Sequence, residues 1–561
     1  MTFRSILTSS LEKIFPDGPV SAEMYNSGSA LRGEIFSFQF AIFQDEDLFL
    51  GDLNIAHEFP GNIRIREVKC VPVDFPAYDS GNPDWALDSR VGMYPDLLRD
   101  INDHVRLLPR QWVSYWISCE VPYVCPPGKY SLKLSFSGVT LWENFEENKK
   151  VLSEETFTLE IINAALPPQK LLHTQWFHAD CLYHYYQVEC WSEAHWRLLE
   201  QYFDSAARHG INMLLTPLWT PPLDTQVGGE RPTVQLIGIT RENGQYTFDF
   251  SKLKRWLDLA RKCGIEFFEM SHFFTQWGAA KTPKIVAVVD GEEKRIFGWD
   301  VDALSEEYRN FLAALMAELL PFLRRENLER RCFFHISDEP AEEHLEHYGK
   351  LSALLQTFLK GEWPMMDALS SFDFYSKGVV ERPVVAGDHI EAVADAKANP
   401  LWTYYCVAQQ NTVPNRFINY PSVRNRIMGT LLYQYNCEGF LHWGFNFYYS
   451  QFSRDFDLDP YKDTSAGRGF ASGDSFLVYP GKDGPEDSIR YEVLREGLQD
   501  LRALRALESA IGRDKVLSFL KEMLGYDMTM KHYPRSAAFL LAIRAMVNRK
   551  LANALSQKDA M

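Results

Sequence analysis

The chain has 561 residues, of which 46% are hydrophobic and 24% charged, so it can bury two or three separate hydrophobic cores. Its 75 acidic residues outnumber its 58 lysines and arginines, and the net charge of −17 argues against nucleic acid or an anionic membrane as a partner. Aromatic residues make up 14% of the chain, which suits a neutral carbohydrate ligand whose apolar C–H faces pack on aromatic rings.

The first 165 residues are predicted to form a β-sandwich domain. Short alternating stretches such as 35–43 and 112–118 are divided by Pro and Gly, and helical periodicity is absent between Ser21 and about Ala165. The turn Pro126-Pro127-Gly128 leads into a further strand, as in β-sandwich proteins. A linker, Leu166-Pro167-Pro168, then separates this domain from the next one.

Residues 166–510 follow a different pattern, in which helices and strands alternate. The helix expected over Ser192 to Arg208 ends at Gly210, and the helix expected over Ser251 to Lys262 ends at Gly264; an apolar strand follows each glycine. Eight strands are expected, at Leu171–Phe177, Asn212–Thr216, Glu266–Met270, Cys332–Ile336, Pro364–Leu369, Pro383–Gly387, Trp402–Val407 and Gly439–Gly444. This alternation predicts a (β/α)8 TIM barrel, whose active site lies at the C-terminal ends of the strands.

Two further segments complete the predicted fold. The long insertion from Phe273 to Asp302 follows the third strand, and we expect a loop that shapes a pocket. After the barrel, a glycine-rich segment leads into a helix from Ser488 to about Leu507, and helical patterns run from Arg513 to Asn553. The predicted fold is therefore multidomain α/β plus all-β: a sandwich, a barrel and a C-terminal helical extension over residues 511–561.

Two adjacent carboxylates, Asp338 and Glu339, follow the fourth strand and precede Pro340. Proline has no N–H and disfavours helix in the residue before it, so the strand should end at these acids. Two acids crowded at a partly desolvated rim tend to raise one pKa, which places a proton donor beside an anion, as in glycosidases. The alternative is a strand-end turn in which the acids only cap the next helix.

The other strand ends distinguish between these two interpretations, because they place polar and aromatic side chains at the same rim. The set comprises His178, Asp180, Trp219, His272, Asp367, Ser370, Asp388, His389, Tyr404, Tyr405, Trp443 and Asn446. Any one of them could be an isolated core residue. Their convergence at one edge of the predicted barrel favours an active site.

The seventh and eighth strands contain no acid over residues 401–407 and 441–446. A common retaining glycosidase needs a second carboxylate about 5 Å from the acid, usually from a distant strand. The sequence therefore suggests a nucleophile in the substrate, a 2-acetamido group that attacks its own anomeric carbon. One protein acid would protonate the leaving oxygen and its neighbour would balance the oxazolinium charge. A conventional nucleophile, Asp367 or Asp388, and a sugar-binding protein without activity are the alternatives.

Three segments resemble glycoside hydrolase family 123 and the related, largely uncharacterised families that share its catalytic domain. They are Asp338-Glu339-Pro340, Trp443-Gly444-Phe445-Asn446, and Gly473 to Gly481 with Ser488-Ile489-Arg490. The resemblance covers about residues 170–505, and a β-sandwich before the barrel is also similar to that family. It implies a β-N-acetylgalactosaminidase in which Asp338 orients the acetamide and Glu339 is the acid/base.

A β-N-acetylglucosaminidase is the alternative specificity, because the choice depends on one or two hydrogen bonds. We expect a small carbohydrate or glycoconjugate as substrate. A tyrosine should bond the acetamide oxygen, with Tyr405 preferred to Tyr404, and Trp443 should form the floor of the pocket. The other residues expected to bind the substrate are Asn446, His272, Asp367 and Trp219.

Neither a cofactor nor a metal is expected. The nine cysteines are scattered without a CxxC pair, which indicates reduced thiols, and no GxxxxGK[ST] or strand-linked GxGxxG motif occurs. Glu343, His344 and His347 share a helix face at spacings that a metal could use, but a solvated face is the simpler interpretation. The first ten residues lack a sustained apolar stretch, and no run approaches 18 apolar residues, so we expect a cytoplasmic protein that does not cross a membrane.

Overall fold

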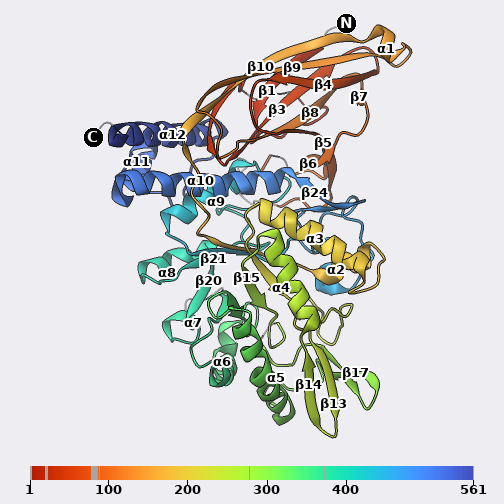
Figure 1. Ribbon diagram of the computed structural model, residues 1–561, viewed down its shortest axis with the longest axis vertical. Helices are drawn as coiled ribbons and strands as arrows, with labels where there is room; N and C mark the ends of the chain where they lie inside the picture. Colours follow the sequence, from red (N-terminus) through yellow and green to blue (C-terminus); the bar gives the residue numbers. More distant parts are fainter. Residues whose placement is uncertain are drawn as a thin grey trace. The chain divides into compact units, whose positions relative to one another are not determined.

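The computed structural model describes residues 3–18, 20, 23–77, 86–87, 89–276, 278–369, 371 and 373–559 (Figure 1). Ser370, named above at the fifth strand, lies outside the described residues. The chain divides into two compact units. The first contains Met1–Gln169, Pro414–Gln434 and Glu486–Met561, and the second contains Lys170–Val413 and Tyr435–Pro485. The end of the first segment at Gln169 lies next to the predicted linker, whereas 414–434 and 486–510 group with the first unit.

Two β-sheets form the N-terminal part of the first unit. In sheet order, one contains β1 (Phe3–Ser9), β3 (Ile35–Gln44), β8 (Gln111–Glu120), β5 (Ile63–Val73), β6 (Gly92–Asp100) and β24 (Gly484–Ser488). The other contains β2 (Ser27–Arg32), β10 (Lys150–Ala165), β9 (Gly128–Thr140), β4 (Phe49–His57) and β7 (Val105–Leu107). Neighbouring strands run antiparallel except β2 and β10, which are parallel.

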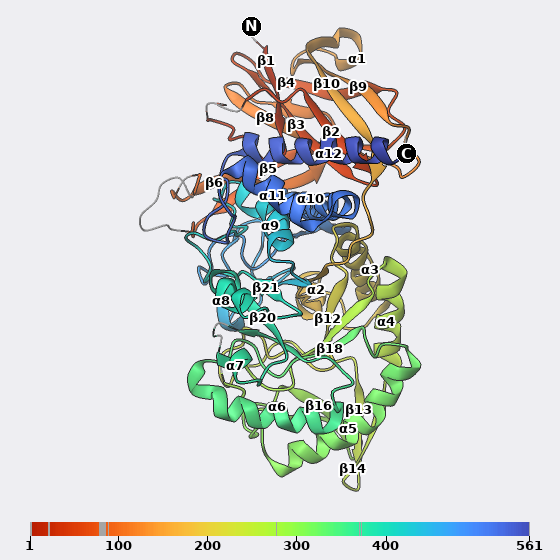
Figure 2. The ribbon, with the colours of Figure 1, turned by 90° about the vertical axis from the view of Figure 1, so that its left-hand side faces the viewer.

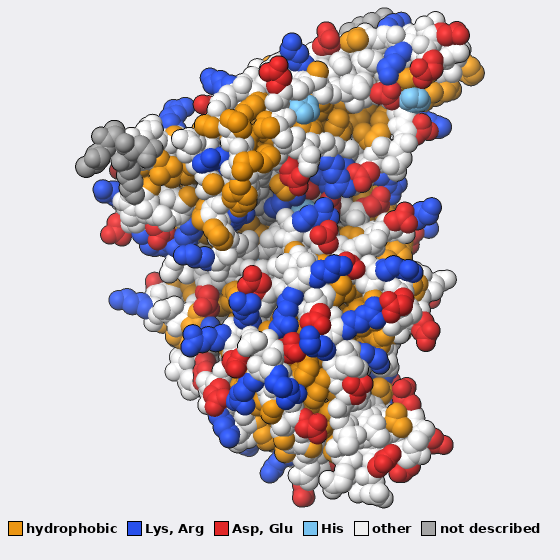
Figure 3. Space-filling view, in the orientation of Figure 1, with side chains coloured by type: hydrophobic (Ala, Val, Ile, Leu, Met, Phe, Trp, Pro, Cys, Tyr) orange, Lys and Arg blue, Asp and Glu red, His pale blue; other side chains and the backbone are white. Residues whose placement is uncertain are grey.

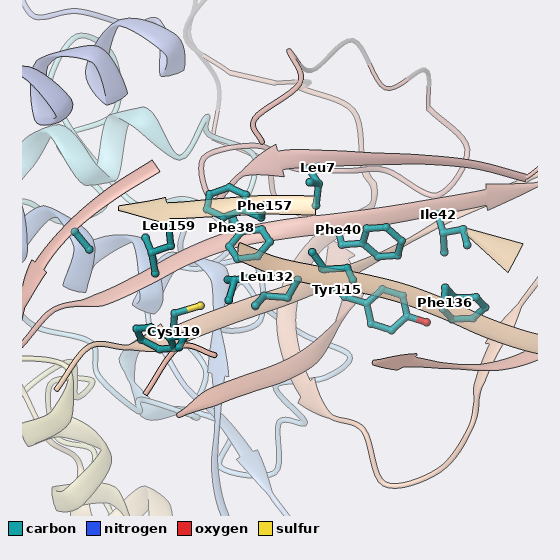
Figure 4. Close-up of a cluster of buried hydrophobic side chains, with 14 of the residues drawn as sticks. Leu7, Phe38, Phe40, Ile42, Tyr115, Cys119, Leu132, Phe136, Phe157 and Leu159 are labelled. Carbon is teal, nitrogen blue, oxygen red and sulfur yellow. The ribbon is translucent and has the colours of Figure 1, made fainter. Parts of the chain in front are cut away.

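The core of this unit lies between the two sheets, as expected for a sandwich (Figure 4). Phe38, Phe40 and Ile42 alternate along β3 and are fully buried, since every second side chain of a strand faces the same side. The Phe38 ring stacks on Phe157 of the other sheet with the ring centroids 4.0 Å apart. The predicted N-terminal β-rich domain is therefore confirmed.

Besides the short α1 (Phe145–Asn148), the described residues of the first unit contain the longer helices α9 (Val423–Gln434), α10 (Ile489–Ile511), α11 (Arg513–Leu524) and α12 (Ala537–Asp559). Gly429 of α9 meets Gly497 of α10 so closely that a Cβ on Gly429 would lie 1.7 Å from the Gly497 carbonyl oxygen. The helices also share buried ion pairs, in which Asp500 of α10 binds both Arg426 and Arg544. Close backbone approach and paired buried charges thus hold these helices together.

Eight parallel strands form the centre of the second unit, and every one matches a predicted strand. They are β11 (Leu172–Gln175), β12 (Met213–Thr216), β15 (Phe267–Met270), β18 (Cys332–Phe334), β19 (Met366–Leu369), β20 (Arg382–Ala386), β21 (Trp402–Tyr404) and β22 (Gly439–His442). Strand β11 lies between β12 and β22, and β18 and β19 are the two ends of the sheet order. A parallel bridge between Phe334 and Met365 joins these ends, which gives a barrel like that of TIM-type folds.

Helices connect successive strands of the barrel. They are α2 (Ala179–Tyr185), α3 (Glu193–Arg208), α4 (Ser251–Cys263), α5 (Glu306–Arg325), α6 (Leu345–Leu359), α7 (Asp373–Ser376) and α8 (Ile390–Asp395) (Figures 1 and 2). The sequence signals for their ends are present, because the Ser192 hydroxyl caps α3 and Gly264, with φ +96°, ends α4. α3 turns Trp196, Leu199 and Phe203 inward along one face.

The insertion after the third strand is more ordered than the predicted loop. It contains a hairpin of β16 (Ile285–Val289) and β17 (Glu292–Phe297), which extends β13 (Gly238–Glu242) and β14 (Gln245–Asp249) into a four-stranded sheet. Asp290 and Gly291 form the turn with positive φ angles of 52° and 85°, which an Asp-Gly pair favours in a two-residue hairpin. Among the described residues, the parts before β16 and after β17 remain irregular, and the part near Gln276 reaches the candidate site.

Within the described residues, no helix combines the length and apolarity needed to span a membrane. On the face drawn in Figure 3, lysine and arginine side chains lie among aspartates and glutamates over both ends of the view. This mixture of signs accompanies the net charge of −17. A surface of this kind does not concentrate positive charge for a polyanion.

Candidate active site

The fourth strand delivers the two predicted acids to the C-terminal rim of the barrel. Asp338 is buried, with 8% of its surface exposed, and Glu339 adopts a φ of +41°. A positive φ is uncommon for a residue with a side chain and persists only where the surroundings impose it, often at functional sites. The next helical turn, Glu342–His344, has Ala341 as its N-cap. The alternative that the acids serve to cap this turn is therefore not supported.

A cavity of about 210 Å³ opens at this rim, smaller than the 300–1,000 Å³ usual for drug-sized ligands and suited to one sugar ring. Its walls come from loops that follow several different strands. The lining residues are Trp176, Leu223, Asp224, Gln276, Asp338, Glu339, Ala368, Tyr404, Cys406, Val407, Leu441, Trp443, Gln451, Phe452 and Phe470. Apolar and aromatic surface thus surrounds a small number of polar groups, as in carbohydrate sites.

Each acid of the pair has one hydrogen-bond donor of its own. Gln276 Nε2 donates to Asp338 Oδ2 over 2.6 Å, and the Tyr404 hydroxyl donates to Glu339 Oε1. Both donors stabilise the ionised forms and so lower the two carboxyl pKa values.

Burial acts in the opposite direction and is the larger effect. Together with the neighbouring Glu339, it raises the pKa of Asp338 to about 8. Although Glu339 is exposed over much of its surface, its carboxyl end is enclosed by protein, and this burial raises its pKa, with the charges of Asp388 and Asp474 adding to the effect. The pair therefore keeps a proton at neutral pH, as a general acid requires.

A buried network of charged groups lies beneath the cavity. His335 Nε2 donates to Glu269 over 2.8 Å and Nδ1 donates to Asp367 over 3.2 Å. Burial alone would lower the pKa of His335, but the two carboxylates raise it to about 9, so the imidazole is a cation. Glu269 also accepts a hydrogen bond of 3.0 Å from the Trp176 indole. This network fixes the Trp176 ring in the cavity wall and places a positive charge near Asp338.

Trp443 is held in the cavity from both ends of the residue. Its indole Nε1 donates to Asp474 over 2.9 Å, and its carbonyl oxygen bonds His178 Nε2 at 2.9 Å. His178 Nδ1 in turn faces Arg231, which forms a buried ion pair of 2.8 Å with Asp180. Burial and the charge of Arg231 lower the pKa of His178, so this histidine is neutral. His178 and Asp180, predicted at the rim, thus support Trp443 from behind.

Three of the predicted site residues, Asp338, Glu339 and Trp443, line the cavity, whereas Tyr405 and Asn446 do not. Tyr405 is buried and packs on Phe440 and His442, with ring centroids 5.2 and 5.3 Å away. The lining residue is its neighbour Tyr404, because successive residues of an extended chain point to opposite sides. Asn446 bonds both backbone groups of His178 and so joins the ends of the first and eighth strands.

The remaining predicted binding residues lie behind the cavity wall. His272 stacks on His335 with the ring centroids 4.5 Å apart, and the Trp219 indole donates to the His272 carbonyl over 2.9 Å. Asp367 accepts hydrogen bonds from His335, from the Ile336 backbone N–H and from the Tyr348 hydroxyl. The side chains of His272, Trp219 and Asp367 thus form buried contacts, and they stabilise the fourth strand and its neighbours instead of lining the cavity.

The structure adds lining residues that sequence reasoning missed, above all Trp176, Asp224, Gln276 and Phe452. Trp176 lies within the first predicted strand and could have been found by the same strand-end rule. The others come from irregular loops, in which spacing carries no signal. Asp224 and Phe452 have positive φ angles of 40° and 62°, which only the structure reveals.

Among the described residues of the second unit, the buried side chains of His272, His335 and Asp367 have donor atoms close enough for a metal ion, within 4.8 Å of one another. Both His335 nitrogens already donate to carboxylates, and the resulting cation would repel a metal ion. The hydrogen-bond network therefore accounts for this cluster. Of the helix-face group, His347 contacts the Ala279 carbonyl and Glu343 is 80% exposed.

A parallel barrel with an acid pair of raised pKa in a sugar-sized cavity at its C-terminal rim defines a glycoside hydrolase. Residues 176–507 match the family model described as "Glycoside hydrolase 123, catalytic domain", which spans more than half of the chain. The chain therefore belongs to glycoside hydrolase family 123.

A solved structure has the same fold. The chain matches a family 123 glycoside hydrolase from Clostridium perfringens, described with the details of glycolipid glycan hydrolysis, over 100% of both chains with a TM-score of 0.73 and 14% identity. A β-glucuronidase from Ruminococcus gnavus covers 86% of this chain and 91% of its own at 10% identity, and its TM-score of 0.29 is too low to support an argument. No curated protein matches the sequence.

The raised pKa of Asp338 predicts a pH-dependent stability difference for Asp338→Asn. The folded-state pKa of about 8 lies above the ordinary value of 3.8, so the folded protein loses stability as the pH rises between these values. Asparagine carries no such cost. We expect the variant to melt about 2 °C or more above the wild type near pH 8.5 and at the same temperature near pH 4. The exposed Asp373→Asn is the matched control, and a pH-independent difference would contradict the assignment.

Proposed function

We propose that the chain removes terminal β-linked N-acetylgalactosamine with retention of configuration, through an oxazolinium intermediate formed by the substrate's own acetamide. The observation that carries this proposal is the adjacent pair Asp338 and Glu339 in the cavity, both with raised pKa values. The two strands opposite, β21 and β22, contribute Tyr404 and Leu441 to the lining and no carboxylate. A substrate nucleophile supplies what the protein lacks there.

In the first step, Glu339 protonates the glycosidic oxygen while the acetamide oxygen bonds C1 and the leaving group departs. Tyr404 donates to Glu339 Oε1, so the proton sits on Oε2. Because the pair keeps one proton and Glu339 carries it in this step, the ionised Asp338 accepts the acetamide N–H and becomes the counter-ion of the developing oxazolinium. The raised pKa of Asp338 in the free enzyme falls when this positive charge forms beside it. The ionised carboxylate therefore stabilises the transition state more than the bound substrate.

In the second step, the deprotonated Glu339 takes a proton from water as the water opens the oxazoline at C1. The same carboxyl thus acts first as acid and then as base, and the product retains the β configuration. Trp443, held at both ends, offers its ring as the pocket floor. Tyr404, and not Tyr405, is the tyrosine in the cavity wall, and its hydroxyl holds Glu339 in place for both steps.

A conventional nucleophile is the main alternative mechanism. Asp367 is 1% exposed and is engaged by His335, Ile336 and Tyr348, while Asp388 does not line the cavity. Asp224 is the one further carboxylate among the described lining residues. A 2-fluoro sugar that labelled Asp224, Asp367 or Asp388 would reveal a protein nucleophile by peptide mass mapping.

The cavity volume supports removal of a single terminal sugar. The Clostridium perfringens relative is described in connection with glycolipid glycans, which supports a glycoconjugate as the natural substrate here. N-acetylglucosamine differs only at C4, and a hydroxyl that a site hydrogen-bonds can be discriminated strongly. β-N-acetylglucosaminidase activity is therefore the second specificity to measure.

The test compares nitrophenyl β-glycosides that differ at one position. We expect the N-acetylgalactosaminide to be hydrolysed and the galactoside with a plain 2-hydroxyl to react at least ~10²-fold more slowly, because it has no internal nucleophile. A thiazoline fused across C1 and C2 should bind far more tightly than the substrate. Ready cleavage of the plain galactoside would contradict the acetamide mechanism, and no cleavage of any glycoside would favour a sugar-binding protein.

A further inference from the structure

Asp224 brings a third carboxylate into the cavity that the proposed reaction does not use. It lies in the loop after β12 and lines the cavity together with the catalytic pair. Its Oδ2 accepts a hydrogen bond of 3.0 Å from the Phe452 backbone N–H. Oδ1 accepts no hydrogen bond from any described residue, so one oxygen of a half-buried carboxyl is available to a ligand.

The backbone of Asp224 is held rigidly in a strained conformation. Its φ is +40°, and Phe452 and Ser453, which contact it, have φ angles of 62° and 50°. The Asp224 N–H donates to Gln276 Oε1 over 2.6 Å, and its carbonyl accepts from the Ser453 hydroxyl over 2.7 Å. Arg231 bonds the preceding carbonyl, of Leu223, at 3.1 Å. Strain maintained by so many contacts indicates a side chain whose position matters.

Gln276 links the backbone of Asp224 to the catalytic pair. One end of its amide accepts from the Asp224 N–H and the other donates to Asp338, each over 2.6 Å. Glu339 marks the side of the sugar ring where the bond to C1 breaks, and Asp338 marks the acetamide at C2. Gln276 bonds both Asp338 and the backbone N–H of Asp224, which places Asp224 next to the acetamide side of the pair. In the orientation of the sugar proposed above, the Asp224 carboxyl then meets the ring beyond C2, away from the reacting carbon.

We propose that Asp224 binds the hydroxyl groups at C3 and C4 of the terminal sugar and that Gln276 fixes its position relative to Asp338. This inference rests on the proposed function. It makes Asp224 the residue that selects the substrate by its C3 and C4 hydroxyl groups. A carboxyl oxygen that receives a hydroxyl hydrogen bond discriminates strongly against sugars that lack the hydroxyl, because it is then left unpaired.

The same geometry argues against Asp224 as the nucleophile. A nucleophile must reach C1 from the face opposite the leaving group, which the acetamide oxygen occupies in the proposed reaction, and Gln276 separates Asp224 from Asp338. Burial, aided by Asp474 and opposed by Phe452, Arg231 and Arg454, raises the pKa of Asp224 to about 7. Its carboxyl group thus carries a proton for much of the time at neutral pH, which suits hydrogen bonding with hydroxyls better than attack on carbon.

The experiment combines Asp224→Asn with substrates that lack one hydroxyl. Asparagine keeps the shape and an oxygen for the Phe452 N–H but replaces the free oxygen with a donor. We expect kcat/KM for the nitrophenyl N-acetylgalactosaminide to fall by about 10–100-fold. With the wild type, kcat/KM should fall by a similar factor when the 3-deoxy or the 4-deoxy substrate replaces the parent substrate. With the variant, the same replacement should lower kcat/KM only a little. Asp457→Asn is the control, because the Asp457 side chain is 90% exposed and does not line the cavity.

The assignment would be overturned if the variant discriminated against both deoxy substrates as strongly as the wild type does. The ratio of deoxy to parent rates does not depend on the fraction of folded enzyme, so partial misfolding of the variant cannot imitate either result. Where the wild type hydrolyses no N-acetylhexosaminide, the proposed function fails. Calorimetric titration with N-acetylgalactosamine then decides the inference: weaker binding by Asp224→Asn supports it, and equal or absent binding overturns it.

Discussion

Replacement of Glu339 by Gln should lower kcat by about 10²–10⁴-fold, because the amide can neither protonate the leaving oxygen nor activate water. The loss should be smallest for dinitrophenyl glycosides, whose leaving group needs no proton, and largest for alkyl glycosides. The size and the Tyr404 contact of the side chain are largely retained in Gln, so we expect the variant to fold and to melt no lower than the wild type. The measurement is kcat against leaving-group pKa for both enzymes.

Glu342→Gln is the matched control for this change. Glu342 is exposed three positions further along the chain and its carboxylate bonds only the Ser371 hydroxyl among its described contacts. Its replacement should leave the leaving-group dependence of the rate as in the wild type. Near-normal hydrolysis of alkyl glycosides by a well-folded Glu339→Gln would remove Glu339 from the acid/base role and reopen the choice of nucleophile.

The second large effect is expected for Asp338→Asn, with a loss of about 10²–10³-fold in kcat and a much smaller change in KM. The physical reason is the timing of the charge, since the acetamide is neutral in the bound substrate and positive only as the ring closes. The asparagine side chain would still accept a hydrogen bond but could not neutralise that charge. Steady-state kinetics with the nitrophenyl N-acetylgalactosaminide measure both constants.

Binding of the thiazoline supplies the complementary measurement. The variant should lose affinity for the thiazoline, which carries the cyclised geometry, and keep its affinity for N-acetylgalactosamine. Asp373→Asn, in an exposed ion pair with Lys377, should change neither value. An Asp338→Asn enzyme with a raised KM and an unchanged kcat would show that Asp338 holds the ground state instead.

The architecture of the barrel was accessible from the sequence because its signals are local. Apolar stretches bounded by a helix stop such as Gly210 or Gly264 identify strands without any tertiary information, and all eight were found. The length of the insertion after the third strand predicts a loop, and it outweighs the one local hairpin signal there, the Asp290-Gly291 turn.

The site was only partly accessible, for two physical reasons. Asp338, Glu339 and Trp443 were found because parallel strands deliver their C-terminal residues to one rim. The choice between Tyr404 and Tyr405 depends on where the strand ends, and a shift of one residue reverses which side chain faces the cavity. Asp224, Gln276 and Phe452 are brought together by loop conformations with no periodicity to reveal them.

The electrostatic character of the cavity limits which glycans the enzyme accepts. Asp224, Asp338 and Glu339 line it, Asp474 lies behind Trp443, and no lysine or arginine occurs among the described lining residues. A protonated iminosugar gains from these carboxylates, whereas a sulfate ester or a uronic acid meets no lysine or arginine in this lining and is repelled by the carboxylates. We therefore expect a terminal sugar that carries such an anionic group to bind this cavity more weakly than its neutral counterpart.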